Sequence, residues 1–336
     1  MAEKRIEARF YEKLDDMVVR CNLCPHECTI KPNGVGICRV RRNEGGVLIS
    51  SGYGRTISMS MDPMEKKPLY HFYPGSFILS VGVNGCNLSC DFCQNWECSQ
   101  RSCPTRYISP EQLIEVAVEN NSIGVCFTYT EPLIWHEYIY DTSVMARERG
   151  LVSVLVTNGY INEEPLTELL PYIDAMNVDL KAMNDEFYVK RCGGHLDPVL
   201  RTLKIAKDKC HIEITNLIIP SANDSPEQIE ELAKWISEEM GEDTVLHISR
   251  FFPHYKAKEP ETPVETLEMA YNIAKKYLKY VYLGNIFLSP SHTVCPVCGN
   301  SLIERWGYNT RVKGLNGSKC SNCNYDTGII NKGGAL

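Results

Sequence analysis

Residues 83–93 read VNGCNLSCDFC, and their first residue, Val83, is also the last residue of the apolar stretch SFILSVGV at 76–83. The first stretch places Cys86, Cys90 and Cys93 in the spacing C-x3-C-x2-C. The second stretch is short and apolar, which predicts a buried strand. Full protein ligation of a four-iron cluster uses four thiolates, so three cysteines leave one iron with an open coordination position. Together the two stretches predict a strand that leads into a loop holding a [4Fe–4S] cluster with a vacant site.

Beyond this loop the sequence alternates between helical and strand patterns. The expected helices are 109–121, 133–150, 197–209, 225–241 and 262–278. The expected strands after 76–83 are 123–129, 151–157, 173–181, 211–220, 244–252 and 280–288. Alternation of this kind is typical of parallel strands joined by crossover helices. With about seven strands and no nucleotide fingerprint after the first, an α/β fold of the partial-barrel type is favoured over an open doubly wound sheet.

Polar motifs follow three of the expected strands. They are Thr128, Tyr129, Thr130 and Glu131 after the second strand, Asn158 and Gly159 after the third, and Asp179 and Lys181 after the fourth. Each motif alone has an ordinary structural explanation: an acid in a first helical turn, a tight turn, or an ion pair at a strand end. In barrels the chemistry lies at the carboxyl ends of the strands, so their shared position predicts one binding site.

The cysteine triad, with Phe92 before its third cysteine, resembles the signature of the radical S-adenosylmethionine (SAM) superfamily. The resemblance implies a partial (β/α)6-type barrel, with the [4Fe–4S] cluster on Cys86, Cys90 and Cys93 and SAM bound at the open iron. One electron from reduced ferredoxin or flavodoxin then cleaves SAM to methionine and a 5′-deoxyadenosyl radical. That radical takes a hydrogen atom from a protein or small-molecule substrate, and this radical chemistry belongs to the cofactor.

The strand-end motifs resemble those of activating enzymes of the pyruvate formate-lyase type, which carry Gly-Gly-Glu-Pro, Asp-Thr-Asn-Gly and Asp-x-Lys. The matching residues are Glu131-Pro132, Asn158-Gly159, Asp179 and Lys181. Tyr129 and Thr130 replace the two glycines, and Val156 replaces the first aspartate. The resemblance implies that residues 128–131, Asn158, Gly159, Asp179 and Lys181 position SAM.

Further stretches resemble the AmmeMemoRadiSam-system radical SAM enzymes, a subgroup related to these activating enzymes. They are CNLCPHEC at 21–28, QNW at 94–96, FTYTEP at 127–132 and YLGN at 282–285. This resemblance implies Memo-type and AMMECR-type proteins as partners. Glycyl-radical enzyme activation is an alternative function that the same motifs leave open.

Two further sets of four cysteines flank the central part. Cys295, Cys298, Cys320 and Cys323 form two C-x2-C pairs separated by 21 residues. Four thiolates on two turns can enclose one zinc ion, so we expect a zinc-ribbon-like module. A rubredoxin-like iron site or an auxiliary cluster is the alternative.

The N-terminal set has the spacing C-x2-C-x3-C-x9-C and consists of Cys21, Cys24, Cys28 and Cys38. This spacing is compatible with zinc or with a second iron–sulfur cluster. We therefore expect three parts: a cysteine-rich extension at 1–75, the barrel at 76–290 and the zinc-ribbon-like module at 291–336.

The composition limits the remaining possibilities. Sixteen cysteines in a chain without a signal-peptide pattern indicate metal ligands in the reducing cytoplasm rather than a disulfide framework. A net charge of −7 argues against sequence-independent nucleic-acid binding, and so against the alternative of an RNA-modifying enzyme. The sequence has no apolar run of membrane-spanning length. A non-enzymatic iron–sulfur electron carrier is a further alternative, although the strand-end residues argue against it.

Overall fold

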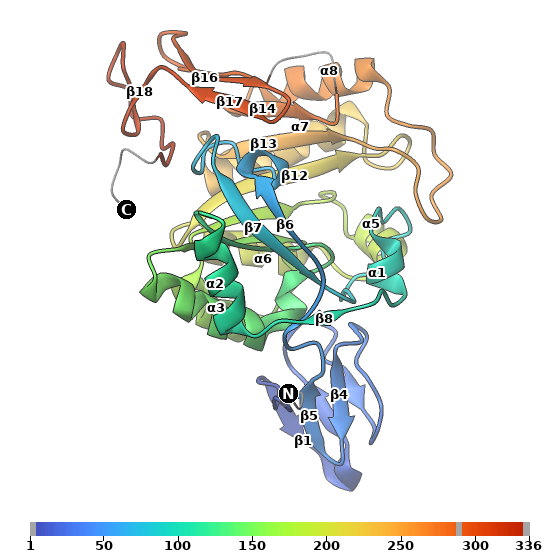
Figure 1. Cartoon of the computed structure of the whole chain (residues 1–336). Coiled ribbons are helices and arrows are strands. Elements are labelled where there is room, and N and C mark those ends of the chain that lie inside the picture. The colour runs from blue at the N-terminus through green and yellow to red at the C-terminus, as the bar shows by residue number, and fades with distance from the viewer. Residues whose placement is uncertain (1–4, 287–290, 332–336) are drawn as a thin grey trace.

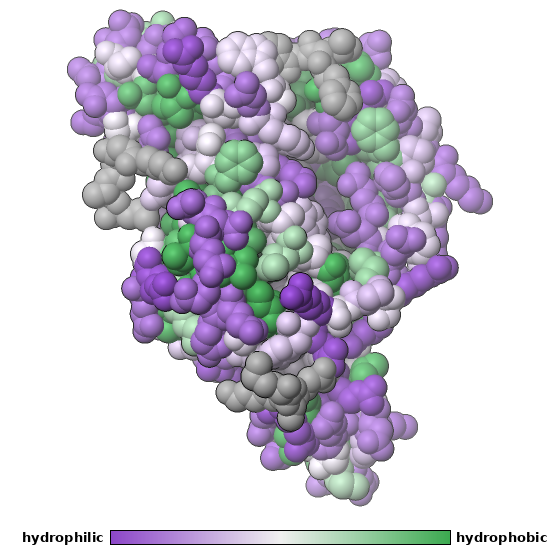
Figure 2. All heavy atoms as spheres, viewed as in Figure 1, coloured by the Kyte–Doolittle hydropathy of each residue, from purple (hydrophilic) through white to green (hydrophobic). Residues whose placement is uncertain are grey.

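The computed structural model describes residues 5–286 and 291–331. Three parts follow one another in Figure 1: short N-terminal strands in blue, a central sheet with helices, and short C-terminal strands in red. On the face shown in Figure 2, hydrophilic side chains predominate and apolar ones lie in small groups. Within the described ranges, none of the helices combines the length and apolar character needed to cross a lipid bilayer.

The central sheet has nine strands in the order β14-β13-β12-β11-β10-β9-β7-β6-β8. Seven neighbouring strands are parallel: β7 (Phe77–Val83), β9 (Gly124–Thr128), β10 (Val152–Thr157), β11 (Ala175–Asp179), β12 (His211–Ile218), β13 (Val245–Arg250) and β14 (Val281–Gly284). The predicted α/β fold with a parallel sheet is thereby confirmed. The expected strand 280–288 ends at Gly284, and residues 287 and 288 lie outside the described ranges.

An antiparallel edge completes the sheet, and the sequence patterns did not indicate it. It consists of β6 (Arg55–Pro63), which pairs with β7, and the short β8 (Arg106–Tyr107). The strand β6 belongs to this sheet although it precedes residue 76. The division of the chain at residues 75 and 290 stays a prediction.

Helices connect the parallel strands. They are α2 (Pro110–Glu119), α3 (His136–Glu148), α4 (Glu163–Leu169), α6 (Asp197–Ala206), α7 (Pro226–Trp235) and α8 (Val264–Ala274). The hydroxyl of Ser109 accepts a hydrogen bond from the backbone of Gln112, whose side chain accepts one from the backbone of Ser109. This reciprocal cap confirms the predicted start of α2, and Ser225 with Gln228 repeats it at α7. The sequence patterns missed α4, which contains a proline in its first turn.

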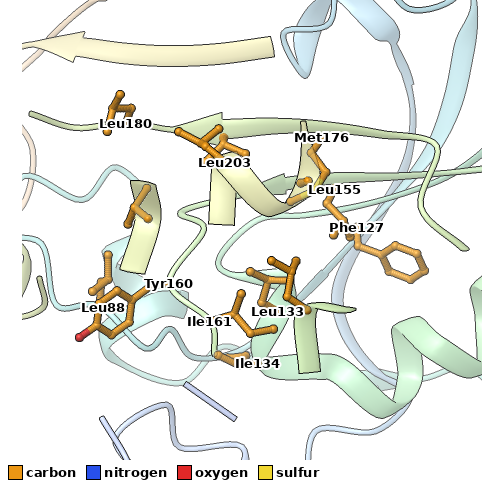
Figure 3. Close-up of a cluster of buried hydrophobic side chains, with 14 of the residues drawn as sticks. Leu88, Phe127, Leu133, Ile134, Leu155, Tyr160, Ile161, Met176, Leu180 and Leu203 are labelled. Carbon is orange, nitrogen blue, oxygen red and sulfur yellow. The ribbon is translucent and has the colours of Figure 1, made fainter. Parts of the chain in front are cut away.

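The hydrophobic core lies between the sheet and these helices. Figure 3 shows Phe127, Leu155 and Met176, one from each of three adjacent strands, near Leu203 of α6, and all four are buried. Side chains alternate along a strand, so the neighbours of these residues face the interior of the partial barrel. Asn177 illustrates this: its amide donates to the Pro68 carbonyl, which belongs to the segment between β6 and β7.

The N-terminal part contains the three-stranded sheet β1 (Tyr11–Lys13), β2 (Val19–Cys21) and β3 (Thr29–Ile30), and the hairpin β4 (Arg41–Glu44)–β5 (Val47–Ser50). A buried ion pair joins this part to the barrel, with 2.6 Å between Nη2 of Arg41 and Oε1 of Glu137 in α3. A buried pair of this kind fixes one docking geometry, because either charge left alone would be costly.

The C-terminal part contains β15 (Thr293–Val294), β16 (Ser301–Trp306) and β17 (Asn309–Val312), followed by the pair β18 (Leu315–Asn316) and β19 (Lys319–Cys320). It packs on the segment 64–76 that precedes β7. Phe72 forms a parallel bridge with Ile330, and the buried Arg305 donates to the Tyr70 carbonyl at 2.5 Å. The C-terminal part is therefore attached to the segment 64–76, which lies beside the barrel.

Candidate active site

The three cysteines of the central motif open onto one cavity. Cys86, Cys90 and Cys93 follow β7, and all three line a cavity of about 390 Å³ at the carboxyl ends of the parallel strands. Burial raises the pKa of the Cys86 thiol well above its usual value, and the charges of Glu131, Cys90 and Cys93 raise it further. Iron cations would offset this penalty by binding the thiolates, so the site suits a metal cluster.

The neighbouring elements hold the cysteine loop in place. Gly85 has φ +92°, and a Cβ atom there would lie 2.1 Å from the Cys38 carbonyl oxygen of the N-terminal part. On the other side, the backbone N–H of Ser89 donates to the carbonyl of Cys192 at 2.7 Å, in the π-helical turn η5 (Tyr188–Cys192). These contacts pre-organise the loop before any cluster binds.

The motifs after β9 and β10 meet each other and the loop. The Glu131 carboxylate accepts from the Thr157 hydroxyl at 2.5 Å and from the Asn158 backbone N–H at 2.7 Å. The Asn158 side chain donates to the Asn87 side chain at 3.0 Å and lies 3.7 Å from the Cys86 sulfur. Burial raises the pKa of Glu131 to about 7. Glu131 thus connects two strand ends to the cysteine loop.

One of the two residues at the glycine positions, Tyr129, keeps a glycine-like backbone. Tyr129 has φ +31°, and its carbonyl accepts from the Val83 backbone N–H at 3.1 Å. The Thr130 hydroxyl donates to the Val83 carbonyl at 2.7 Å. Thr128, Tyr129, Thr130 and Glu131 all line the cavity. The turn therefore pairs with the end of β7, where the cysteine loop begins.

Asp179 and Lys181 form an ion pair at the end of β11, with 2.9 Å between Oδ2 and Nζ. Burial disfavours the ammonium of Lys181, but Asp179 and the nearby thiols of Cys90 and Cys192 outweigh burial and raise its pKa. Both side chains line the cavity. Of the predicted residues around the triad, Gly159 is the exception: it follows Asn158 but packs near Val178 of the core, outside the cavity lining.

The C-terminal cysteines have the geometry of a single-ion site. The sulfur atoms of Cys295 and Cys323 are 3.6 Å apart, and those of Cys298 and Cys320 are 3.7 Å apart. All four lie within 4.8 Å of one another. Tetrahedral Zn–S bonds of about 2.3 Å place the sulfurs about 3.8 Å apart. These residues fit a zinc-ribbon-like module.

The N-terminal cysteines are also near one another, but less tightly. Cys21, Cys24 and Cys38 are buried and Cys28 is half-buried. Burial raises the pKa of Cys24, and the charges of the other three thiols add to that effect. Among the described residues, only the C-terminal set brings three or more ligand atoms within 4.8 Å. The wider N-terminal spacing suits a cluster, whose thiolates bind separate irons, better than a single ion.

Sequence patterns missed several residues of the cavity. Lys66, Lys67, Tyr70, His247 and Tyr308 line it. His247 alternates with buried core residues along β13. This alternation could have predicted that the His247 side chain points toward the interior of the barrel. The lysines and Tyr308 come from outside the parallel strands and carried no such signal.

A disulfide joins Cys98 and Cys103 beside the loop. The expectation that cysteines act as metal ligands therefore does not extend to these two, which stood outside the three sets. Asn84 hydrogen-bonds both the backbone N–H and the carbonyl of Cys103. The disulfide is thus attached to the start of the cysteine loop.

Comparisons with known proteins agree with this geometry. The model of the Radical SAM superfamily matches residues 80–236. The uncharacterized protein MJ0808 of Methanocaldococcus jannaschii is 47% identical over 96% of this chain and 99% of its own length. The (2S)-3-sulfopropanediol dehydratase activating enzyme of Klebsiella oxytoca is 29% identical over 37% of this chain and 39% of its own length. The pyruvate formate-lyase-activating enzyme of Clostridium pasteurianum is 26% identical over 46% of this chain and 68% of its own length. This chain is therefore an enzyme that belongs to the radical SAM superfamily.

Proposed function

We propose that Cys86, Cys90 and Cys93 hold a [4Fe–4S] cluster at which SAM is reductively cleaved, and that the enzyme then removes a hydrogen atom from a substrate. The observation that carries this proposal is that the three thiols and the strand-end residues line one cavity. When bound, the cluster supplies an open iron for SAM and the electron that breaks its carbon–sulfur bond.

The protein residues position SAM in this scheme. Lys181 offers an ammonium to the SAM carboxylate, and its ion pair with Asp179 fixes that ammonium at the end of β11. Glu131 holds Asn158 beside Cys86, so the turns after β9 and β10 stay aligned with the cluster loop. Thr128, Tyr129 and Thr130 form the first of these turns and line the cavity, and Gly159 continues the second turn behind Asn158.

The flanking cysteine sets are proposed to hold further metals. Cys295, Cys298, Cys320 and Cys323 bind zinc in a structural site, since their thiols already approach tetrahedral spacing. Cys21, Cys24, Cys28 and Cys38 bind a second iron–sulfur cluster, with zinc as the alternative. According to this proposal, the chain divides into the extension 1–75, the barrel 76–290 and the module 291–336.

Reduced ferredoxin or flavodoxin is the proposed electron donor, as is typical for activating enzymes of this superfamily. Memo-type and AMMECR-type proteins are the proposed partners if the chain belongs to the AmmeMemoRadiSam subgroup. The substrate is a small molecule or a protein. Activation of a glycyl-radical enzyme is the second candidate, favoured by the similarity to the Klebsiella oxytoca and Clostridium pasteurianum activating enzymes.

Anaerobic reconstitution with metal counting tests the proposal. Wild-type protein is expected to release 5′-deoxyadenosine from SAM after reduction, and Cys86→Ala is expected to lose about four irons while keeping its zinc. Cys210→Ala is the matched control, because Cys210 lies outside all three sets and points to the Ala206 carbonyl. Unchanged iron in Cys86→Ala, or wild-type protein that leaves SAM intact, would refute the assignment.

A further inference from the structure

The cavity extends from the cysteine loop to a second group of polar side chains. Lys66 ends the short helix η2 (Met64–Lys66), Lys67 follows it, and both line the same cavity as Cys86. The Tyr129 side chain reaches this group too, because its hydroxyl donates to Asp62 of β6 at 2.8 Å. The backbone of Tyr129 belongs to the proposed SAM site, whereas its ring faces the lysines.

This corner of the cavity carries an excess of positive charge. The single carboxylate of Asp62 faces two ammonium groups, with 2.8 Å from Oδ1 to Lys66 Nζ and 2.8 Å from Oδ2 to Lys67 Nζ. The neighbouring Glu65 is balanced by Arg305, whose Nε lies 3.6 Å away. Two lysines against one aspartate leave one net positive charge. A charge at this partly buried position is screened less than one on the surface.

The two ammonium groups also have hydrogen-bond donors to spare. Each carries three N–H groups. Lys67 is buried and donates to Asp62 and to the Ser80 hydroxyl, while Lys66 is less enclosed, with 41% of its side chain exposed. An anion with several acceptor oxygens, such as a carboxylate or a phosphate, matches both the charge and the donors.

Backbone strain at Tyr129 points in the same direction. A tyrosine with φ +31° occupies a conformation that costs about 1–3 kcal/mol and that glycine adopts without cost. The strained backbone places the ring centre 5.4 Å from Lys67 Nζ and 6.0 Å from Lys66 Nζ. Strain of this kind is concentrated at functional sites. The Tyr129 hydroxyl and both ammonium groups thus converge on the Asp62 carboxylate, which fixes the two lysines beside the cavity.

We propose that Lys66 and Lys67, held in place by Asp62 and Tyr129, form a site for an anionic group of the substrate, either a carboxylate or a phosphate. The charges and contacts of these side chains support the anion site, whereas its use by the substrate rests on the proposed function. An anion held there places the rest of the substrate between the lysines and the cysteine loop, inside the same cavity. Tyr308 of the C-terminal part also lines this cavity, so that part would help to enclose the substrate.

Isothermal titration calorimetry of the anaerobically reconstituted full chain, saturated with SAM, tests the anion site. The probes are inorganic phosphate in one arm and glutarate in the other, at constant chloride concentration. Binding of either probe to wild type is expected, and the arm that binds identifies the anionic group. Because a charged hydrogen bond is worth about 1.5–3 kcal/mol, Lys66→Gln should bind at least about tenfold more weakly.

Two further variants show whether weaker binding in Lys66→Gln comes from the lost positive charge or from a change in structure. Lys66→Arg keeps the charge and is expected to bind within about threefold of wild type, since a guanidinium also pairs with anions. Lys190→Gln is the control, because Lys190 is exposed and pairs with Glu186. Absence of binding to wild type, equal affinity in Lys66→Gln, or equal loss in Lys66→Gln and Lys66→Arg would overturn the proposal. Calorimetry needs no turnover, so release of 5′-deoxyadenosine by wild type reports separately on the proposed function.

Discussion

The carboxylate of Glu131 accepts the backbone N–H of Asn158 at 2.7 Å, although 27 residues separate them. The same carboxylate also accepts from the Thr157 hydroxyl and from the Leu133 backbone N–H. One buried side chain therefore fixes the end of β9 against the end of β10. The Asn158 side chain in turn contacts the cysteine loop. The hydrogen bond between Glu131 and Asn158 therefore helps to fix the proposed SAM site relative to the strand ends.

Replacing Glu131 by Gln should weaken SAM binding. The amide has one acceptor oxygen and presents its NH2 group to a donor, so at least one buried N–H loses its partner at a cost of about 1–3 kcal/mol. We expect the Kd for SAM to rise about fivefold to a hundredfold, measured by equilibrium dialysis on reconstituted protein. Glu164→Gln, at an exposed position of α4, is the control. An unchanged Kd would mean that Glu131 does not organise the site.

Replacing Gly85 by Ala should remove the cluster. The new Cβ atom would lie 2.1 Å from the Cys38 carbonyl oxygen, and φ +92° is strained for alanine. Either the cysteine loop or the N-terminal part must then move. We expect iron content to fall by about four atoms per chain, counted after anaerobic reconstitution. Gly150→Ala has a similar positive φ but open space around it, and its iron content should match wild type.

The sequence was sufficient to predict the parallel sheet and the residues at its strand ends, because both depend on local patterns. Hydrophobic runs located the strands, and the position of Asp179 near the end of one of them placed it at the cavity. Lys66 and Lys67 were not predictable in this way. Their place in the cavity depends on the packing of the segment 64–76 against residues far away in the sequence, such as Asn177 and Arg305.

The buried hydrogen bonds around Glu213 were likewise not predictable from local sequence patterns. Its carboxylate accepts from the backbone of His71, 142 residues away, and pairs with His247 on the next strand at 2.5 Å. A glutamate within an apolar strand pattern gives no hint of these partners. Such contacts follow from the three-dimensional path of the chain, which no local periodicity contains.

The buried His71 should make stability depend on pH. Burial lowers its pKa to about 3, and the positive charge of Arg305 and the other histidines adds to this against the opposing effect of Glu213. The unfolded chain, with a histidine pKa of about 6.5, takes up a proton as the pH falls below that value, while the folded chain does not. Stability should therefore fall with decreasing pH in the window between about 6.5 and 3.

Urea denaturation of the anaerobic holoprotein at pH 7.5, 6.5 and 5.5 measures this effect. A group that titrates only in the unfolded state contributes up to about 1.4 kcal/mol per pH unit below its unfolded pKa. His71→Gln keeps a side-chain amide that can hydrogen-bond the Tyr282 hydroxyl in either direction, and it should lose that part of the slope. His195→Gln, at an exposed site, should keep it. Identical slopes in wild type and His71→Gln would show that His71 takes up protons in the folded protein as it does in the unfolded chain.

Loss of the C-terminal metal should loosen the segment that carries the two lysines. Cys320 is buried in the small core of the C-terminal part, and that part holds the segment 64–76 through the Phe72–Ile330 bridge and the contact of Arg305 with Tyr70. Structural zinc sites contribute directly to folding, so Cys320→Ser should lose one zinc and part of this packing.

Hydrogen–deuterium exchange should then rise in residues 66–76 and stay unchanged in α6, which lies on the helical side of the sheet. Cys210→Ser, which alters a thiol outside all three cysteine sets that points to the Ala206 carbonyl on the helical side of the sheet, controls for the loss of a sulfur atom. If zinc is lost while exchange in 66–76 remains at the wild-type level, the C-terminal part does not support the wall of the cavity.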